Sequence, residues 1–167
     1  MKNLNQQILK FDFNQNFTDD DFYVSKSNEH VFDLLMKWPS WEKNLINISG
    51  ENFSGKTHLI SIFLKRFRGV KLDAKSINNN IIEKIKIHQN IIIENLNKDI
   101  DEKLIYTLIN TIEQNNKYLI MTSTKPIVNI NYNLVDLKSR CKNFLLLNIE
   151  KPDDDLMFAL IMKSLAD

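Results

Sequence analysis

The sequence contains few of the residues that define several classes of protein. Cys141 is the single cysteine among 167 residues, and glycine and proline number three each. One cysteine excludes a disulfide framework and a cysteine zinc site, and it favours a reducing compartment. The three histidines are scattered and lack the spacing of metal ligands. No apolar run is long enough to cross a bilayer, and residues 1–20 are too polar for a secretory signal, so we expect a cytoplasmic protein without a membrane anchor.

An excess of charge of either sign is also missing. The 22 basic and 21 acidic residues leave a formal net charge of +1. Proteins that track the phosphates of DNA usually carry a basic excess, so we expect no direct sequence-specific DNA binding. A chain of this length fits one compact domain that can bury a substantial core.

The hydrophobic pattern alternates between two kinds of segment. Short apolar runs predict strands, and longer segments with apolar residues at helical spacing predict helices. The run Ile91-Ile92-Ile93 suits a central parallel strand covered on both faces. We expect strands at residues 45–48, 70–72, 90–96, 118–121 and 144–149, and helices at residues 31–35, 59–67, 81–87, 102–114, 134–141 and 153–165. This order predicts an α/β fold with a parallel five-stranded sheet and helices on both faces.

Residues 50–57, Gly-Glu-Asn-Phe-Ser-Gly-Lys-Thr, match the phosphate-binding motif G-x-x-x-x-G-K-[ST] in full. The motif follows an expected strand and precedes an expected helix, which is the context that it requires. Gly50 and Gly55 let the backbone approach phosphates, which are bound by backbone amides and the helix N-terminus. Lys56 can reach the terminal phosphates and Thr57 can ligate magnesium, so the motif predicts a P-loop NTPase that binds ADP or ATP with Mg²⁺. The alternative is a strand-turn-helix corner that matches the motif by accident.

The third expected strand ends in Glu94-Asn95. P-loop ATPases place an acid that orients magnesium at this point, and active ones follow it with an acid that activates water. Glu94 can bind a metal through water, whereas Asn95 cannot accept a proton, so we do not expect vigorous hydrolysis by this chain alone. The competing interpretation is that Glu94 is merely a polar residue at a strand end.

Two further candidates lie at the ends of expected elements. Thr124, in the segment Thr-Ser-Thr-Lys-Pro at residues 122–126, can face a terminal phosphate, although Ser and Thr also occupy ordinary turns. Arg140 ends the short helix before the fifth strand, from which a guanidinium could reach a nucleotide held by a neighbouring subunit. An ordinary surface arginine is the alternative.

Five segments together resemble the DnaA family of AAA+ proteins, and more closely its shorter Hda-like members of the alphaproteobacterial type. The segments are Phe-Tyr-Val-Ser through Asn at 22–28, Trp-Pro-Ser-Trp at 38–41, Gly-Lys-Thr-His-Leu at 55–59, Thr-Ser-Thr-Lys-Pro at 122–126 and Leu-Lys-Ser-Arg at 137–140. They are similar, in order, to the family's segment beside the adenine, its W-P-x-W element, its form of the P-loop, its T-S-D-R-P element and its L-x-S-R element.

The resemblance implies roles for individual residues of a nucleotide site. Tyr23 and Val24 would lie beside the adenine, and Arg140 would act in trans, across a subunit boundary. Asn52, Phe53, Ser54 and His58 would join the motif residues around the phosphates, and Thr57 and Glu94 would hold the metal.

Three positions depart from the family pattern. Glu94 and Thr124 stand where the family has Asp, and Lys125 stands where it has Arg. These departures bear on nucleotide sensing and on turnover by the chain itself. Asn95, in contrast, matches the Hda-like members.

The resemblance also implies a function and partners. It implies a regulator of chromosomal replication initiation that binds ADP or ATP, docks on DnaA and supplies Arg140, so that DnaA-bound ATP is hydrolysed with the help of the sliding clamp. A small DnaA-like or helicase-loader ATPase is one alternative, and an adaptor whose nucleotide is structural is another. A homo-oligomer is left open.

The N-terminal arm carries a possible clamp-binding peptide of the family type. Gln6, Leu9 and Phe11 form Q-x-x-L-x-F, in which Leu9 and Phe11 lie on one side of an extended peptide and can enter one apolar pocket. Leu9 and Phe11 could instead pin the arm to this protein's own sheet, or Phe11 and Phe13 could form a β-edge. We therefore expect an arm at residues 1–20, an AAA+ domain at 21–151 and the start of a lid helix at 152–167, with the rest of the C-terminal lid missing or truncated.

Overall fold

A computed structural model describes residues 22–78, 80–81 and 85–166. A five-stranded parallel sheet runs through the domain in the order β2-β3-β4-β1-β5. The strands are β1 (Leu45–Ser49), β2 (Val70–Asp73), β3 (Asn90–Leu96), β4 (Tyr118–Ser123) and β5 (Leu145–Asn148). The helices are α1 (Glu29–Met36), α2 (Lys56–Phe67), α4 (Glu102–Gln114), α5 (Val135–Cys141) and α6 (Asp154–Ala166), with short 3₁₀ turns at Ala74–Ser76 and Ile127–Asn129. The predicted α/β fold class is confirmed.

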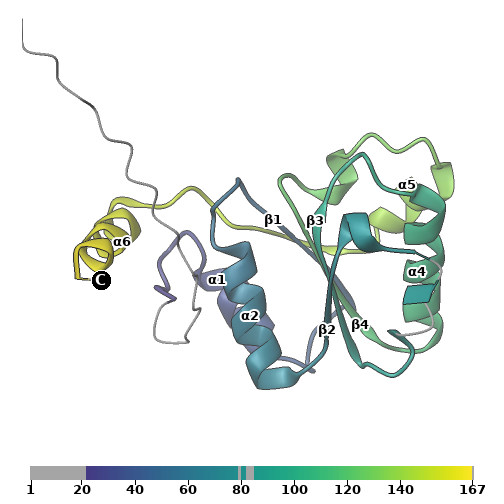
Figure 1. Cartoon of the computed structure of the whole chain (residues 1–167), viewed down its shortest axis with the longest axis horizontal. Coiled ribbons are helices and arrows are strands. Elements are labelled where there is room, and N and C mark those ends of the chain that lie inside the picture. Colours follow the sequence, from purple (N-terminus) through teal and green to yellow (C-terminus); the bar gives the residue numbers. More distant parts are fainter. Residues whose placement is uncertain (1–21, 79, 82–84, 167) are drawn as a thin grey trace, which may run out of the picture.

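Both faces of the sheet are covered, and the strand sequences show why. Ile91 and Ile93 of β3 pack into one cluster with α4 and α5, whereas Ile92 packs into a second cluster with α1 and α2. Because side chains alternate across a strand, a continuous isoleucine run supplies both layers. Figure 1 shows α1 and α2 on one side of the sheet and α4 and α5 on the other.

Helix α4 illustrates how the pattern sets a boundary. The Asp101 side chain accepts hydrogen bonds from the backbone N–H groups of Lys103 and Leu104, which caps the helix N-terminus. Its buried residues, Ile105, Leu108, Ile109 and Ile112, recur at helical spacing and face the sheet. The observed range equals the expected one at residues 102–114.

Other boundaries differ modestly from expectation. Helix α2 begins at Lys56, inside the phosphate-binding motif, because the chain turns directly from the glycine into the helix. Helix α1 ends at Met36, one residue beyond the expected end and just before Trp38-Pro39, where a proline disfavours further helix. The expected helix at residues 81–87 falls partly outside the described residues. Within the described residues, no helix combines the length and apolar character that crossing a membrane requires.

The strand order fixes where a ligand site can lie. Strand β1 sits between β4 and β5, and β3 lies next to β4, so the chain crosses over between consecutive strands. In such open parallel sheets the carboxyl ends of neighbouring strands meet at a crevice. Asn47 stabilises this region, because its buried amide donates to the Met121 carbonyl and the Ser123 hydroxyl while its oxygen accepts from the N–H of Ile127.

Candidate functional site: a phosphate-binding loop with an apolar pocket

The phosphate-binding loop connects the end of β1 to the first turn of α2. Gly55 caps α2 with a left-handed φ of 89°, a conformation that residues with a Cβ rarely adopt. Gly50 has no room for a side chain, since an added Cβ would lie 2.7 Å from Ser54 Oγ and 3.1 Å from the Ile149 carbonyl oxygen. The loop therefore needs both glycines, and it delivers the N-terminus of α2 with its free amides to the crevice.

Lys56 lies at the centre of this loop. Its ammonium donates to the carbonyl oxygens of Gly50 (2.7 Å) and Glu51 (2.6 Å) and to Ser54 Oγ (3.1 Å). Burial lowers the pKa of Lys56 from its ordinary value of 10.5. The same ammonium that ties the loop together is placed to bind an anion at the helix N-terminus.

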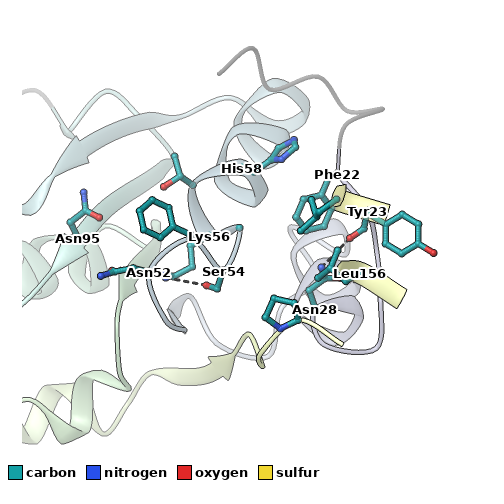
Figure 2. Close-up of a pocket in the computed structure, with 14 residues that line it drawn as sticks. Phe22, Tyr23, Asn28, Asn52, Ser54, Lys56, His58, Asn95 and Leu156 are labelled. Atoms are coloured by element: carbon teal, nitrogen blue, oxygen red, sulfur yellow. Dashed lines mark hydrogen bonds between the residues drawn. The ribbon is translucent and has the colours of Figure 1, made fainter. Parts of the chain in front are cut away.

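A pocket of about 520 Å³ opens beside the loop. One end is formed by the phosphate loop and the beginning of α2, and the other by apolar side chains from the N-terminal segment and from α6. The lining residues are Phe22, Tyr23, Asn28, Asn52, Phe53, Ser54, Gly55, Lys56, Thr57, His58, Asn95, Pro152, Leu156 and Leu160. Figure 2 shows Asn95 on one side of Lys56 and Ser54, with Asn28 and Leu156 on the other.

The segment before α1 forms the apolar wall. The Phe22 ring stacks on Phe32 with centroids 5.8 Å apart and meets the edge of His58 at 5.2 Å. Asn28 closes the segment on itself, because its amide donates to the Tyr23 carbonyl and its oxygen accepts from the N–H of Ser25. Ser27 then joins the segment to the region after β5, where its carbonyl accepts from the N–H of Glu150. This wall is thus held from two sides.

The two residues expected beside an adenine are placed differently from each other. Tyr23 lines the pocket, although its ring is directed away from Lys56 in Figure 2 and its residue is 48% exposed. Val24 does not line this pocket and instead lines a cavity of about 240 Å³ with Tyr23, Ser25 and Lys26. Phe22, the residue before Tyr23, also lines the pocket, and its ring contacts the His58 ring.

Glu94, near the end of β3, is buried with a residue exposure of 6%. Its Oε2 lies 3.2 Å from the ammonium of Lys71 on β2. Its Oε1 is buried and has no hydrogen-bond partner among the described residues. Mg²⁺ prefers oxygen ligands, so this unpaired carboxylate oxygen is chemically suited to coordinate Mg²⁺ directly or through a water molecule. No cluster of three or more His, Cys, Asp or Glu residues suited to a metal occurs in the described part of the chain.

Asn95 follows in a left-handed conformation, with φ of 62°, at a point where the pairing of β3 with β4 is irregular. Its backbone N–H donates to Thr122 Oγ1, and its side-chain amide donates to Asp73 Oδ2 at 2.7 Å. This hydrogen bond is the largest cause of the lowered pKa of Asp73, followed by the hydrogen bond from the backbone N–H of Lys75. Asn95 lines the pocket, and its neutral amide cannot act as a general base there.

A second cavity of about 370 Å³ lies on the other side of the phosphate loop. Thr124 lines it together with Gly50 and Ser54, which puts the exposed Thr124 next to the loop. Phe53 lines both cavities, is 102% exposed and has a left-handed φ of 64°. A fully exposed aromatic residue therefore occupies a strained position at the tip of the loop.

Arg140 lies away from these cavities, at the end of α5 on the opposite face of the sheet from α2. Its Nη1 donates to Glu113 Oε2 of α4 over 2.8 Å, and the two side chains are 38% and 30% exposed. The arginine is thus accessible and is paired within its own chain. No sequence pattern predicted this pair, because Glu113 is one of many acidic residues on helical surfaces.

Sequence reasoning overlooked several residues that the fold brings to the site. Lys71 and Asp73 reach it from β2, and Leu156 and Leu160 reach it from α6. Only their positions in the sequence could have indicated a role. Lys71 and Asp73 alternate near the end of a strand, and Leu156 and Leu160 are one helical turn apart. Gln6, Leu9 and Phe11 lie outside the described residues.

Comparisons with known proteins identify the fold. No protein-family profile matches the sequence, and no curated protein matches it. Domain III of the replication initiation protein DnaA from Thermotoga maritima superposes with a TM-score of 0.74 at 19% identity, over 92% of this chain and 75% of that chain. AMPPCP-bound DnaA from Aquifex aeolicus gives a TM-score of 0.71 at 18% identity, over 92% of this chain and 56% of that chain. The crystal structure of DnaI gives 0.62 at 12% identity, over 80% and 87%.

Identities this low establish the fold and not the activity. The sheet order, the phosphate-binding loop and these neighbours give the chain the α/β fold of AAA+ P-loop domains, as the sequence predicted. The chain corresponds to about half of the length of the Aquifex aeolicus DnaA chain.

Proposed function

We propose that this protein binds ADP or ATP and acts as a nucleotide-dependent regulator in the initiation of DNA replication. The observation that carries the first part is the pocket, whose polar end is a complete phosphate-binding loop and whose other end is apolar. A nucleoside phosphate has the same two-part character, since it joins a charged group to a flat apolar base.

The phosphates would meet Lys56 and the amides at the start of α2. A helix N-terminus and an ammonium together favour a polyanion, and the Lys56 ammonium would exchange its carbonyl partners for phosphate oxygens. The base would lie among Phe22, Leu156 and Leu160, with the edge of His58 close by. This placement uses only the residues that line the pocket.

Magnesium would be held by the Thr57 hydroxyl and the Glu94 carboxylate. The metal, when bound, would neutralise phosphate charge and orient the terminal phosphate. Glu94 supplies a buried anionic ligand, and Thr57 supplies a hydroxyl from the first turn of α2. Thr124, which lines the second cavity with Gly50 and Ser54, would contact the terminal phosphate.

Hydrolysis by the isolated chain should be slow. Asn95 stands where a general base is needed, and an amide cannot take a proton from water. Its neighbour Asp73 is exposed and contacts Asn95, but Asp73 does not itself line the pocket. The protein therefore suits a role in which nucleotide is held and chemistry occurs on a partner.

The role in replication rests on the likeness to DnaA structures together with Arg140. The guanidinium lies half exposed at the end of α5, from which it could act on ATP bound by a partner such as DnaA. Release from Glu113 would be part of that docking. The arm residues Gln6, Leu9 and Phe11 would link this activity to the sliding clamp.

Nucleotide binding is tested by calorimetry with ADP. The wild type should bind, and Lys56→Ala should lose binding because the phosphate charge is no longer met, while its circular dichroism spectrum stays that of the wild type. Lys43→Ala is the matched control, since this exposed lysine does not line the pocket. Equal ADP affinity in wild type and Lys56→Ala would contradict the proposal.

The regulatory role is tested by following hydrolysis of DnaA-bound ATP with and without this protein and a loaded clamp. Stimulation that disappears in Arg140→Ala supports it. The likeness to DnaI favours a second candidate, a helicase-loader ATPase. Multiple Mg²⁺-dependent turnovers per second by the purified chain, lost in Lys56→Ala, would support that candidate instead.

A further inference from the structure

Both residues that end β3 are tied to the edge strand β2. Lys71 contacts Glu94 at 3.2 Å, and Asp73 contacts Asn95 at 2.7 Å. Strand β2 pairs only with β3 in the sheet order, and the register sets Lys71 opposite Ile92 and Asp73 opposite Glu94. Strand β2 therefore places the Lys71 ammonium beside the Glu94 carboxylate and the Asp73 carboxylate beside the Asn95 amide.

The Lys71 side chain lies on the nucleotide side of the sheet. Val70 and Leu72 pack against the cluster beneath α4, so the side chain between them points to the other face. Ile92, the residue opposite Lys71, packs in the cluster with α2, and Glu94 lies two residues further along the same face. Lys71 thus approaches Glu94 from the side that α2 covers.

The charges at this contact are unequally exposed. The Glu94 side chain is 9% exposed, whereas the Lys71 side chain is 40% exposed. A buried carboxylate needs a nearby positive charge or hydrogen-bond donors, and Lys71 provides a charge on a long flexible stem that reaches solvent. The second Glu94 oxygen has no hydrogen-bond partner in the part of the chain that the structure describes. One carboxylate oxygen is therefore paired with Lys71, and the other is buried without a cation or donor beside it among the described residues.

We infer that Lys71 is a built-in competitor of Mg²⁺ for Glu94. A divalent cation at Glu94 would lie near the Lys71 ammonium, and like charges at that distance repel. Mg²⁺ binding therefore requires Lys71 to swing toward solvent, which its exposure permits. The inference rests on the proposed nucleotide site, and it makes Lys71 a positioning residue that acts through Glu94.

This competition has a functional consequence. While Lys71 holds Glu94, nucleotide is retained mainly by the phosphate loop, and the metal adds little to its affinity. A partner that drew Lys71 away from the edge of the sheet would strengthen the metal site without touching the nucleotide. Strand β2 is accessible for this because it lies at the sheet edge.

The test titrates MgCl₂ into the full chain with a fluorescent ADP analogue, starting in EDTA. Lys71→Met keeps the apolar stem and removes the charge. We expect its Mg²⁺ midpoint to fall by roughly three- to tenfold relative to wild type, a range that allows for solvent screening of an exposed lysine. Lys71→Gln should show the same direction, and it serves if the methionine variant does not fold. An unchanged or higher midpoint in the folded variant would overturn the inference.

The Glu94→Gln variant tests whether Lys71 affects Mg²⁺ binding through Glu94. In that background Lys71→Met should no longer change the midpoint, because the shared ligand is gone. A full effect of Lys71→Met in Glu94→Gln would show that Lys71 acts elsewhere, and it too would overturn the inference.

A measurement without nucleotide distinguishes failure of this inference from failure of the proposed function. If the analogue does not bind wild type even in EDTA, the nucleotide proposal fails. Thermal unfolding in MgCl₂ alone still tests Lys71: Mg²⁺ should stabilise Lys71→Met at lower concentrations than wild type, because a ligand of the native state raises the melting temperature. Equal Mg²⁺ dependence of the two melting temperatures in that assay would overturn the inference.

Discussion

The side-chain amide of Asn95 donates to the carboxylate of Asp73 over 2.7 Å, joining the ends of two neighbouring strands beside the phosphate-binding loop. The contact holds the amide of a pocket residue against an ionised carboxylate. It gives Asn95 a defined orientation, with its amide nitrogen toward β2.

Asn95→Ala should raise the pKa of Asp73 toward its ordinary value of 3.8, because the largest cause of its lowering is removed. A carboxyl with a depressed folded-state pKa stabilises the fold above its unfolded pKa and loses that contribution as pH falls through the folded pKa. The stability difference between wild type and Asn95→Ala should therefore be constant near neutrality and shrink below about pH 3.8. Carboxyl carbon NMR and urea unfolding at several pH values measure both effects.

Lys75→Ala is the matched control for that titration. It keeps the backbone N–H that donates to Asp73 and removes only the smallest of the lowering causes. It should leave most of the lowered pKa in place. Identical Asp73 titration curves in wild type and Asn95→Ala would contradict the assignment.

Phe53→Gly should stabilise the fold. A left-handed φ destabilises a residue with a Cβ by roughly 1–2 kcal/mol, and glycine removes this strain. Glycine also makes the unfolded chain more flexible, which offsets part of the stabilisation. Phe53 makes up no part of the core because it is fully exposed. We expect the free energy of unfolding to rise by about 0.5 kcal/mol in denaturant titrations. Phe53→Ala keeps the Cβ and should show no gain; equal stability of the two variants would refute the strain argument.

Arg140→Ala should lower the free energy of unfolding by less than about 1 kcal/mol, because exposed ion pairs are weak and screened. Stimulation of hydrolysis by a partner, if Arg140 acts in trans, should be lost at the same time. Glu113→Gln should free the guanidinium and leave stimulation intact or increased. Lys138→Ala, an exposed cation two residues away on the same helix, controls for a general loss of positive charge. A large loss of stability in Arg140→Ala would make the arginine a structural residue.

Asn47→Leu should be among the more damaging substitutions, although it inserts an apolar residue into a buried strand. It would remove one hydrogen-bond partner each from the Ile127 N–H, the Met121 carbonyl and the Ser123 hydroxyl, of which the hydroxyl still donates to the Lys125 carbonyl. Buried groups that lose a partner cost about 1–3 kcal/mol each when nothing replaces it, so we expect a loss of about 2–4 kcal/mol in thermal or denaturant unfolding. The exposed Asn129→Leu should cost far less. Similar costs at the two positions would rule out the hydrogen-bond explanation.

The sequence alone determined the features that depend on neighbours along the chain. The alternation of strands and helices follows from periodicity, and the continuous isoleucine run of β3 suited a strand buried on both faces, which the structure shows. The phosphate-binding loop was readable because its glycines, lysine and threonine are consecutive, and its conformation is set within eight residues. For the same reason the range of α4 could be predicted from its cap and its apolar spacing.

Tertiary structure alone decided which distant residues meet. Lys71 with Glu94, Asp73 with Asn95 and Arg140 with Glu113 are 23, 22 and 27 residues apart. Those contacts depend on strand register and helix packing, which periodicity does not specify, because any of several strand orders satisfies the same pattern. Val24 lies outside the pocket for a similar reason: Asn28 folds its segment so that Phe22 forms the wall. Local sequence patterns predict the secondary structure of each segment, and only the packing of the sheet and its helices determines which charged and aromatic side chains face one another.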